Sequence, residues 1–184
     1  MIQCSPPTKR IVQQPTMNLS VCPFGILVDT REQAPWTFQG IVLRGDQQVV
    51  RQHKQTLQTG DYSIAIGDYS IQSYAHHFTI ERKSASDLVG SVTAGNARFR
   101  REHERMAEMI ESGGFACVVI EGSMSAICEE LDADDGRRAS GNTILGVTAS
   151  WPQKYGVPWF YAGDRRRAEL LAFQIMHKWW EQNG

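Results

Sequence analysis

The stretch Thr79–Asp87 reads T-I-E-R-K-S-A-S-D and holds the most informative pattern of the chain. Apolar residues alternate up to Glu81, which predicts a β-strand that carries this carboxylate at its end. Because side chains alternate between the two faces of a strand, Glu81 and Lys83 are expected on one face and Arg82 on the other. The strand rise separates Glu81 from Lys83 by roughly 6–7 Å, about the span of one metal ion with its bound water. The pattern therefore predicts a divalent-cation site with a positive charge beside it, as a nuclease requires.

Further acidic residues lie at two other predicted strand ends. Ile-Leu-Val ends in Asp29, with Glu32 three residues later, and this junction also fits a plain strand-to-turn transition with a capping aspartate. The sequence G-D-Y-S-I occurs twice, with Asp61 in the first copy and Asp68 in the second. Gly–Asp is a turn signal, so one copy closes a hairpin while the other presents its aspartate to the site.

These residue types match the chemistry of phosphodiester cleavage. Breaking the bond builds negative charge on phosphate oxygens, and a metal ion both polarises the phosphate and lowers the pKa of the attacking water. Mg²⁺ prefers oxygen ligands, usually one or two carboxylates together with water and phosphate. Asp29, Asp61 and Glu81 are the candidate carboxylates. Lys83 stays cationic near neutral pH and is expected to orient the water or to offset the developing charge.

The order of predicted elements favours an α/β layer fold, because strands and helices alternate after the E-R-K stretch. Residues 1–23 are rich in proline and polar residues and are predicted to form a flexible tail, with residues 24–184 as one domain. One predicted helix carries Arg98, Arg101 and Arg105 on a single face. A solvated face is the ordinary meaning of such charges, and contact with DNA phosphates is the functional alternative.

Composition bounds these hypotheses. The chain has 184 residues, of which 41% are hydrophobic and 21% charged, and these are values of a globular domain. The net charge of −1 gives no general signature of nucleic-acid binding, although clustering of arginines matters more than the sum. The four cysteines include no C-x-x-C pair, so reduced thiols are expected. Without a secretory segment or an apolar run of about 18 residues, we expect a cytoplasmic or nucleoid-associated protein and no membrane partner.

Three motifs occur in order, each at a predicted strand end: V-D-T-R-E at 28–32, T-G-D-Y-S at 59–63 and I-E-R-K-S-A-S-D-L at 80–88. Together they resemble the nuclease domain of the XPF family of structure-specific endonucleases, here in a stand-alone form. That family's signature is Gly–Asp, a variable gap and E-R-K-x-x-x-D. The resemblance implies a restriction-endonuclease-like (PD-(D/E)XK) fold with a central mixed sheet flanked by helices. It also implies cleavage of branched, flap or single/double-strand junction DNA with Mg²⁺ or Mn²⁺.

Carried over position by position, the resemblance implies a catalytic set formed by Asp29, Glu32, Asp61, Glu81, Arg82 and Lys83. Within it, Asp29, Asp61 and Glu81 would bind the metal, and Arg82 would support the conformation or the phosphate. We favour Asp61 over Asp68 because the residues before Asp61 match the family's approach to this strand. Asp68 remains the rival, since it leaves a gap nearer the family's usual spacing.

Two alternatives to this endonuclease function stay open. The family includes inactive partner subunits that keep the fold, lose the acidic residues and only position DNA. A restriction- or repair-type nuclease of the same fold would instead cut linear duplex. The resemblance also implies pairing through the late helices, as a homodimer or a heterodimer, and the Trp-rich C-terminal end fits either this pairing or ordinary core burial.

Overall fold

The computed structural model describes residues 18–65, 73–133 and 139–184. The strands are β1 (Leu19–Asp29), β2 (Val42–Leu43), β3 (Asp46–Gln55), β4 (Tyr62–Ala65), β5 (Phe78–Ser84), β6 (Phe115–Glu121) and β7 (Trp159–Tyr161). The helices are α1 (Ala85–Val92), α2 (Asn96–Glu111), α3 (Met124–Asp132), α4 (Gly141–Tyr155) and α5 (Arg165–Asn183). The predicted α/β architecture is confirmed.

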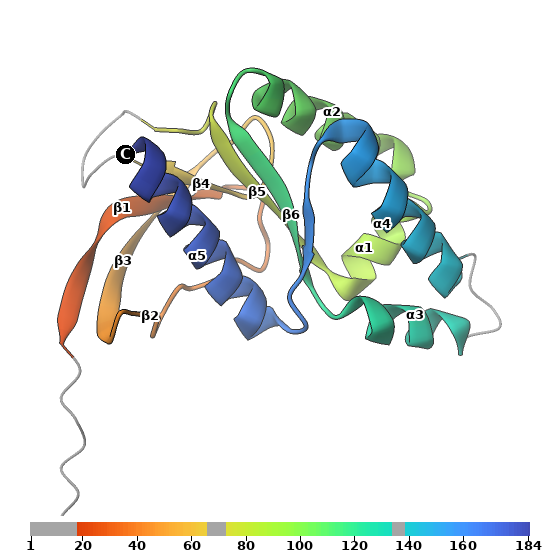
Figure 1. Cartoon of the computed structure of the whole chain (residues 1–184), viewed down its shortest axis with the longest axis horizontal. Coiled ribbons are helices and arrows are strands. Elements are labelled where there is room, and N and C mark those ends of the chain that lie inside the picture. The colour runs from red at the N-terminus through yellow and green to blue at the C-terminus, as the bar shows by residue number, and fades with distance from the viewer. Residues whose placement is uncertain (1–17, 66–72, 134–138) are drawn as a thin grey trace, which may run out of the picture.

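The strands form one mixed sheet in the order β2-β3-β1-β4-β5-β6-β7. β1 pairs in parallel with β3, and β5, β6 and β7 form a second parallel group. β4 lies between the two groups and pairs in antiparallel fashion with both β1 and β5. The ends of β1 and β5 therefore lie on either side of the turn that leads into β4, and all three predicted motifs meet there (Figure 1).

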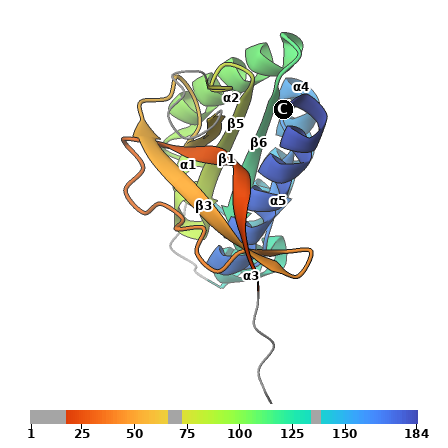
Figure 2. The same ribbon diagram turned by 90° about the vertical axis from the view of Figure 1, so that its left-hand side faces the viewer.

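Helices cover both faces of the sheet. α5 lies on one face and α1, α2, α3 and α4 on the other, as Figures 1 and 2 show from two directions. The side chains of β6 alternate between the two cores: Cys117 and Val119 pack with α5, whereas Val118 and Ile120 pack with the four-helix side. This alternation is the strand periodicity expected for a sheet buried on both faces. β5 follows the same rule, because Ile80 is buried on the α5 side.

The boundary of the predicted tail needs correction. β1 begins at Leu19, so the last part of the predicted tail of residues 1–23 belongs to the sheet. Leu19 pairs with Gln47 of β3, and the register then shifts between Val21 and Gly25. Pro23 lies in this irregular part of the strand. Because proline lacks the N–H that a strand donates, its presence argued against a strand in the sequence. Residues 1–17 lie outside the described part of the chain.

Pro152 lies inside α4, although proline in a helix interior usually kinks or ends the helix. α4 runs through Pro152 and ends three residues later at Tyr155. Gly156 then adopts a left-handed conformation with φ of 69° and donates its N–H to the carbonyl of Pro152. Proline in a last turn leaves only one backbone bond unmade, so the helix tolerates it. Among the described helices, none has the length and apolar character needed to cross a membrane.

Candidate active site

A tight turn positions Asp61. Gly60 has φ of +71°, and a Cβ built on it would lie 2.1 Å from Oγ1 of Thr79, so only glycine fits. The N–H of Asp61 donates to the carbonyl of Ile80 (2.9 Å), and the N–H of Arg82 donates to Oδ2 of Asp61 (2.7 Å). The Asp61 carboxylate is thereby fixed beside β5, next to the E-R-K stretch. This close approach is the physical reason for a Gly–Asp pair at this point.

Glu81 and Lys83 share one face of β5, as predicted. Nζ of Lys83 donates to Oε1 of Glu81 at 2.5 Å, so the two side chains are in direct contact instead of standing about 6–7 Å apart. Both are shielded from solvent: Glu81 is 5% exposed and the Lys83 side chain 12%. The buried ion pair holds the ammonium group beside the carboxylates.

Asp29 is bound by its neighbour Arg31. Its two carboxylate oxygens accept four hydrogen bonds, from the N–H, Nε and Nη2 of Arg31 and from the N–H of Leu57, at 2.7–2.8 Å. These bonds fill the lone-pair positions of a carboxylate. Burial alone would raise the pKa of Asp29, but the hydrogen bonds from Arg31 and Leu57 outweigh it and lower the pKa. Metal ligation by Asp29 remains a prediction, and it would require Arg31 to leave.

Arg82 points to the opposite face of β5, where it binds two other acids. Its Nε and Nη2 donate to the two carboxylate oxygens of Glu121 (2.7 and 2.9 Å), and Nη1 donates to Glu32 (3.2 Å). Glu121, at the end of β6, also accepts from Nε1 of Trp36 (2.7 Å) and from Arg165 (2.9 Å). These contacts favour a structural role for Arg82 over a phosphate-binding one, and both roles remain predictions. Glu121 and Arg165 are residues that the sequence pattern missed.

The predicted catalytic residues other than Asp29 line one pocket of about 510 Å³ near the ends of β1 and β5. Its lining includes Arg31, Glu32, Asp61, Glu81, Lys83 and Arg98. Asp29 lies behind Arg31 and outside this lining. The site thus brings together two of the three predicted metal ligands, with Glu32 as a third acidic side chain and positive charges on both sides.

The electrostatics of the pocket are dominated by close carboxylates. Burial raises the pKa of Asp61 well above its ordinary value, and the charges of Glu81 and Glu32 raise it further. Burial also raises the pKa of Glu81, although Lys83 opposes this effect. Burial would lower the pKa of Lys83, but the charge and hydrogen bond of Glu81 outweigh it, so the lysine is held cationic.

This donor set fits a hard divalent cation. The charge of Glu81 destabilises the charged form of Asp61, and a nearby cation would stabilise both carboxylates. Across residues 18–65, 73–133 and 139–184, no three Asp, Glu, His or Cys side chains are grouped closely enough to form a metal site by themselves. Mg²⁺ needs only one or two carboxylates and completes its shell with water and phosphate oxygens. Asp61 and Glu81 would supply these two.

A further acid, Glu102 of α2, lies beside Lys83 and was not singled out from the sequence. Its Oε2 is 3.8 Å from Nζ of Lys83, and its Oε1 accepts from Nε of Arg98 (3.1 Å). Nζ of Lys83 also lies 4.8 Å from the ring centre of Phe99. The only sequence signal was an acidic residue one helical turn after Arg98. The lysine is therefore confined by β5 below and by α2 at its side.

His103 connects α2 to β7 by a hydrogen bond. Nε1 of Trp159 donates to its Nε2 (2.8 Å), so the ring proton lies on Nδ1, which donates to the carbonyl of Phe99 (2.9 Å). The imidazole is fully buried, and this burial lowers its pKa to about 4. The neutral histidine thus connects Phe99, the aromatic neighbour of Lys83, to Trp159 of β7.

The three arginines predicted to bind nucleic acid lie in different surroundings. Arg98 reaches the rim of the pocket and is 83% exposed. Arg101 is exposed on α2, and Arg105 lines a separate hollow together with Glu108. DNA contact by any of them remains a prediction. Asp68, the rival of Asp61, lies outside the described residues.

The N-terminal turn of α5 holds the loop that follows β1. Nη2 of Arg165 donates to the carbonyls of Ala34 and Pro35 (2.8 and 2.9 Å). Arg166 donates to the carbonyls of Gln39 and Gly40 (2.9 and 3.0 Å). The loop that carries Glu32 is therefore fixed to the far end of the chain.

Comparisons with known proteins agree with this geometry. The family model described as the ERCC4 domain matches residues 28–172. No curated protein matches the chain by sequence. XPF from Aeropyrum pernix has a similar structure, with a TM-score of 0.55 and 18% identity, over 84% of this chain and 60% of that chain. The structure of XPF from Aeropyrum pernix in complex with DNA gives the same TM-score and identity, over 86% of this chain and 66% of that one.

This chain therefore spans about 60% of the length of the XPF chain that it resembles. The likeness identifies the mixed sheet with its flanking helices as the restriction-endonuclease-like fold that was expected. The family match includes the ends of β1, β4 and β5, and so the whole candidate site. The chain belongs to the ERCC4 domain family.

Proposed function

We propose that this protein is a metal-dependent DNA endonuclease that hydrolyses phosphodiester bonds at branched, flap or single/double-strand junctions. The observation that carries the proposal is the pocket in which Asp61, Glu81 and Lys83 meet. Membership of the ERCC4 domain family supports it, and so does the structural likeness to an XPF that has been solved with DNA. Retention of both carboxylates and the lysine favours an active enzyme over an inactive DNA-positioning subunit.

Asp61 and Glu81 would hold Mg²⁺ or Mn²⁺, which supplies Lewis-acid activation of the phosphate and of a water molecule. Lys83 is held cationic by Glu81 and therefore acts as a fixed positive charge, not as a base. Such a charge stabilises the negative charge that develops on the phosphate oxygens. Glu102 and the ring of Phe99 restrict the lysine to this place.

Two arginines stand on the rim of the same pocket, Arg31 and Arg98. Arg98, with 83% of its side-chain surface exposed, can turn toward a phosphate at small cost, whereas Arg31, 66% exposed, would first have to release the buried carboxylate of Asp29. We expect them to hold the phosphates on the two sides of the bond to be cut. Their positive charge would also draw DNA to a chain whose net charge is −1.

The test uses end-labelled splayed-arm, flap and linear duplex DNA with purified protein in Mg²⁺, Mn²⁺ or EDTA. Junction DNA should be cut with either metal and not in EDTA. Glu81→Gln and Lys83→Ala should abolish cutting and leave the circular-dichroism spectrum and most of the DNA affinity unchanged. Glu129→Gln, at an exposed position of α3, is the matched control and should cut like the wild type.

The outcomes separate the alternatives. DNA binding without cleavage by the wild-type protein in any metal would assign the chain to the inactive, DNA-positioning class. Equal cutting of linear and branched DNA would favour the restriction- or repair-type reading. Wild-type activity of Glu81→Gln would show that the chemistry lies elsewhere. Calorimetric titration with Mn²⁺ should show weaker binding in Asp61→Asn and Glu81→Gln, and Asp29→Asn tests the third predicted ligand.

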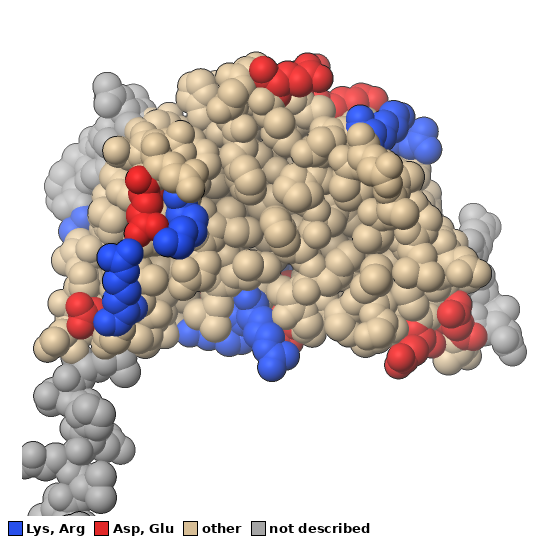
Figure 3. Space-filling model, in the orientation of Figure 1, with Lys and Arg blue, Asp and Glu red and all other residues tan. Residues whose placement is uncertain are grey.

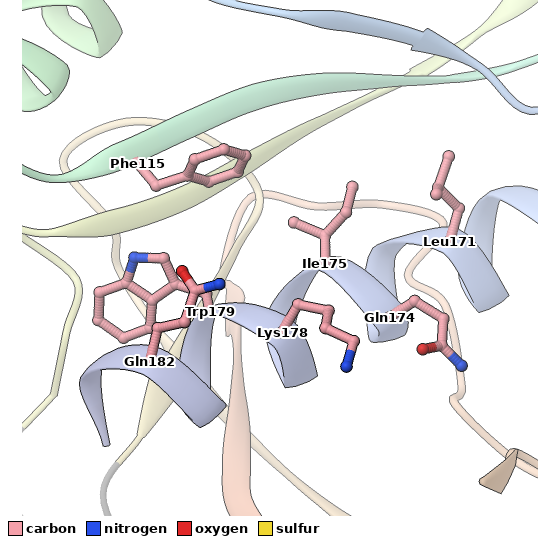
Figure 4. A pocket seen from close by; sticks show the side chains of 7 residues that line it. All are labelled: Phe115, Leu171, Gln174, Ile175, Lys178, Trp179 and Gln182. Atoms are coloured by element: carbon pink, nitrogen blue, oxygen red, sulfur yellow. The ribbon is translucent and has the colours of Figure 1, made fainter. Parts of the chain in front are cut away.

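The α5 face is proposed to pair two copies of the chain. Phe115, Leu171, Ile175 and Trp179 line a mostly apolar pocket of about 370 Å³ along α5, shown in Figure 4. In Figure 3 uncharged side chains cover the middle of the molecule, and acidic and basic side chains gather over the C-terminal half of α5. An apolar surface of this kind is typical of an interaction site.

Sedimentation of the purified protein over a range of concentrations tests this pairing. The wild type should form a dimer, and Ile175→Glu should produce a monomer because it places a charge in the apolar pocket. Val49→Glu, at a position 44% exposed on β3, is the control and should leave the dimer intact. A wild-type protein that stays monomeric throughout would contradict the pairing, but not the nuclease chemistry.

A further inference from the structure

A second hollow of about 390 Å³ continues the candidate active site between α1 and α2. It shares Lys83, Ser86, Asp87 and Arg98 with the first pocket. Beyond them it extends along both helices, where its lining includes Gly90, Ser91, Gly95, Phe99 and Glu102. A substrate bound at the carboxylates can therefore reach this hollow by passing Lys83.

The charges that line the hollow balance. Two cations, Lys83 and Arg98, face two anions, Asp87 and Glu102, which gives a formal sum of zero. Arg98 and Lys83 both approach Glu102, and Asp87 accepts from the hydroxyl of Ser84 (2.6 Å). Beyond Arg98 at its rim, no surplus positive charge remains inside the hollow to attract a second phosphate. The carboxylates and the hydroxyls of the lining are instead acceptors for the exocyclic amino groups and ring N–H groups of a nucleobase.

Two glycines create the space. The N–H of Gly95 donates to the carbonyl of Gly90 (2.8 Å), and this bond closes the corner between α1 and α2. A Cβ on Gly95 would lie 3.2 Å from the same carbonyl oxygen, so the corner requires a small residue. A Cβ on Gly90 would meet no atom within 4 Å, because that position opens into the hollow. The size of the space lies within the range of small-ligand pockets, about 300–1,000 Å³.

We propose that the hollow between α1 and α2 receives the base of an unpaired nucleotide that adjoins the phosphodiester held at Asp61, Glu81 and Lys83. The inference rests on the proposed nuclease function and specifies its substrate. A base in duplex must be unstacked and unpaired before it can enter, which costs a few kcal/mol, whereas an unpaired base has no pairing to lose. The hollow therefore selects junctions by the state of one base, and no base-specific contact is needed.

The binding test uses splayed-arm DNA with 2-aminopurine placed in turn at each unpaired position beside the junction. The full-length protein is added in EDTA, so that cleavage does not interfere. Fluorescence should rise at one position, because the base leaves its stack as it enters the hollow. Gly90→Leu fills the hollow and should remove this rise, together with a loss of about tenfold in affinity for splayed-arm DNA.

Gly146→Leu is the matched control. It is another helical glycine whose Cβ would meet no atom within 4 Å, but it lies exposed on α4. Both variants should fold, since leucine favours a helix over glycine, and their circular-dichroism melting curves verify this. Gly146→Leu should keep the fluorescence rise and the affinity of the wild type.

A cleavage arm separates this inference from the nuclease function. With Mg²⁺, an abasic residue at the responsive position should slow cutting by the wild type and leave Gly90→Leu unaffected. If DNA is cut but no single position responds, or if Gly90→Leu responds like the control, the base-binding role is wrong and the nuclease remains. If no DNA is cut, the nuclease fails, while a rise that depends on Gly90 still supports the hollow.

Discussion

Replacing Arg82 with methionine separates a structural from a phosphate-binding role for this residue. Its guanidinium makes three hydrogen bonds to Glu121 and Glu32, and all three side chains are only 8% exposed. Removing one partner of a buried ion pair costs about 3–5 kcal/mol, because the other charge stays buried. Glu121 would keep Arg165 and Trp36 as partners. We therefore expect a loss at the low end of this range, about 3 kcal/mol in the free energy of unfolding.

For a chain of this length, that loss lowers the melting temperature by roughly 6–12 °C, at about 2–4 °C per kcal/mol. Urea unfolding followed by tryptophan fluorescence gives the free energy, with Arg101→Met as the exposed control, expected within about 0.5 kcal/mol of wild type. The double variant with Glu121→Gln should lose less than the sum of the single losses. A stable Arg82→Met with weakened DNA binding would refute the structural role and assign Arg82 to the phosphate.

Three further outcomes are expected. Gly60→Ala should lower the free energy of unfolding in urea by about 1–3 kcal/mol or more, because Gly60 has a positive φ and an added Cβ would clash with Thr79. A neutral effect would show that the turn can relax. The pKa of His103 is lowered on folding to about 4 from an ordinary value of 6.5, so the unfolded chain binds more protons between these values. Stability should therefore fall as pH drops through this window, and His103→Leu should flatten the slope. Asp61→Asn should abolish cleavage and Asp68→Asn should preserve it, in parallel assays on junction DNA, and the reverse result would exchange their roles.

The local part of the site could be predicted from sequence. Strand alternation was enough to place Glu81 and Lys83 together and Arg82 on the other face, and a short apolar run marked the strand that ends at Asp29. These features depend on periodicity over a few residues, which the sequence displays directly. The ammonium–carboxylate contact is closer than predicted, because side chains on one face lean together across the two-residue spacing.

The remaining part depends on contacts between distant segments. Glu121 meets Arg82 across 39 residues and Trp36 across 85, and no local pattern encodes such pairs. β3 was also hard to recognise, because most of its side chains are exposed and polar and show no apolar alternation. The hydrogen bonds between Asp29 and Arg31 were not predicted although the two residues lie close in sequence, since Asp29 was considered as a metal ligand or a capping residue and not as the partner of an arginine.

Glu121 accepts hydrogen bonds from Trp36, Arg82 and Arg165, and these contacts affect how the chain folds during its synthesis on the ribosome. Glu121 is synthesised 44 residues before Arg165, a delay of roughly 2–9 s at about 5–20 residues per second. During that interval α5 has not been translated, and the nascent sheet lacks the helix that later covers the face on which Phe78 and Val119 are buried. The pocket thus acquires its final shape only after α5 docks, and until then the growing chain presents the kind of apolar surface that chaperones bind.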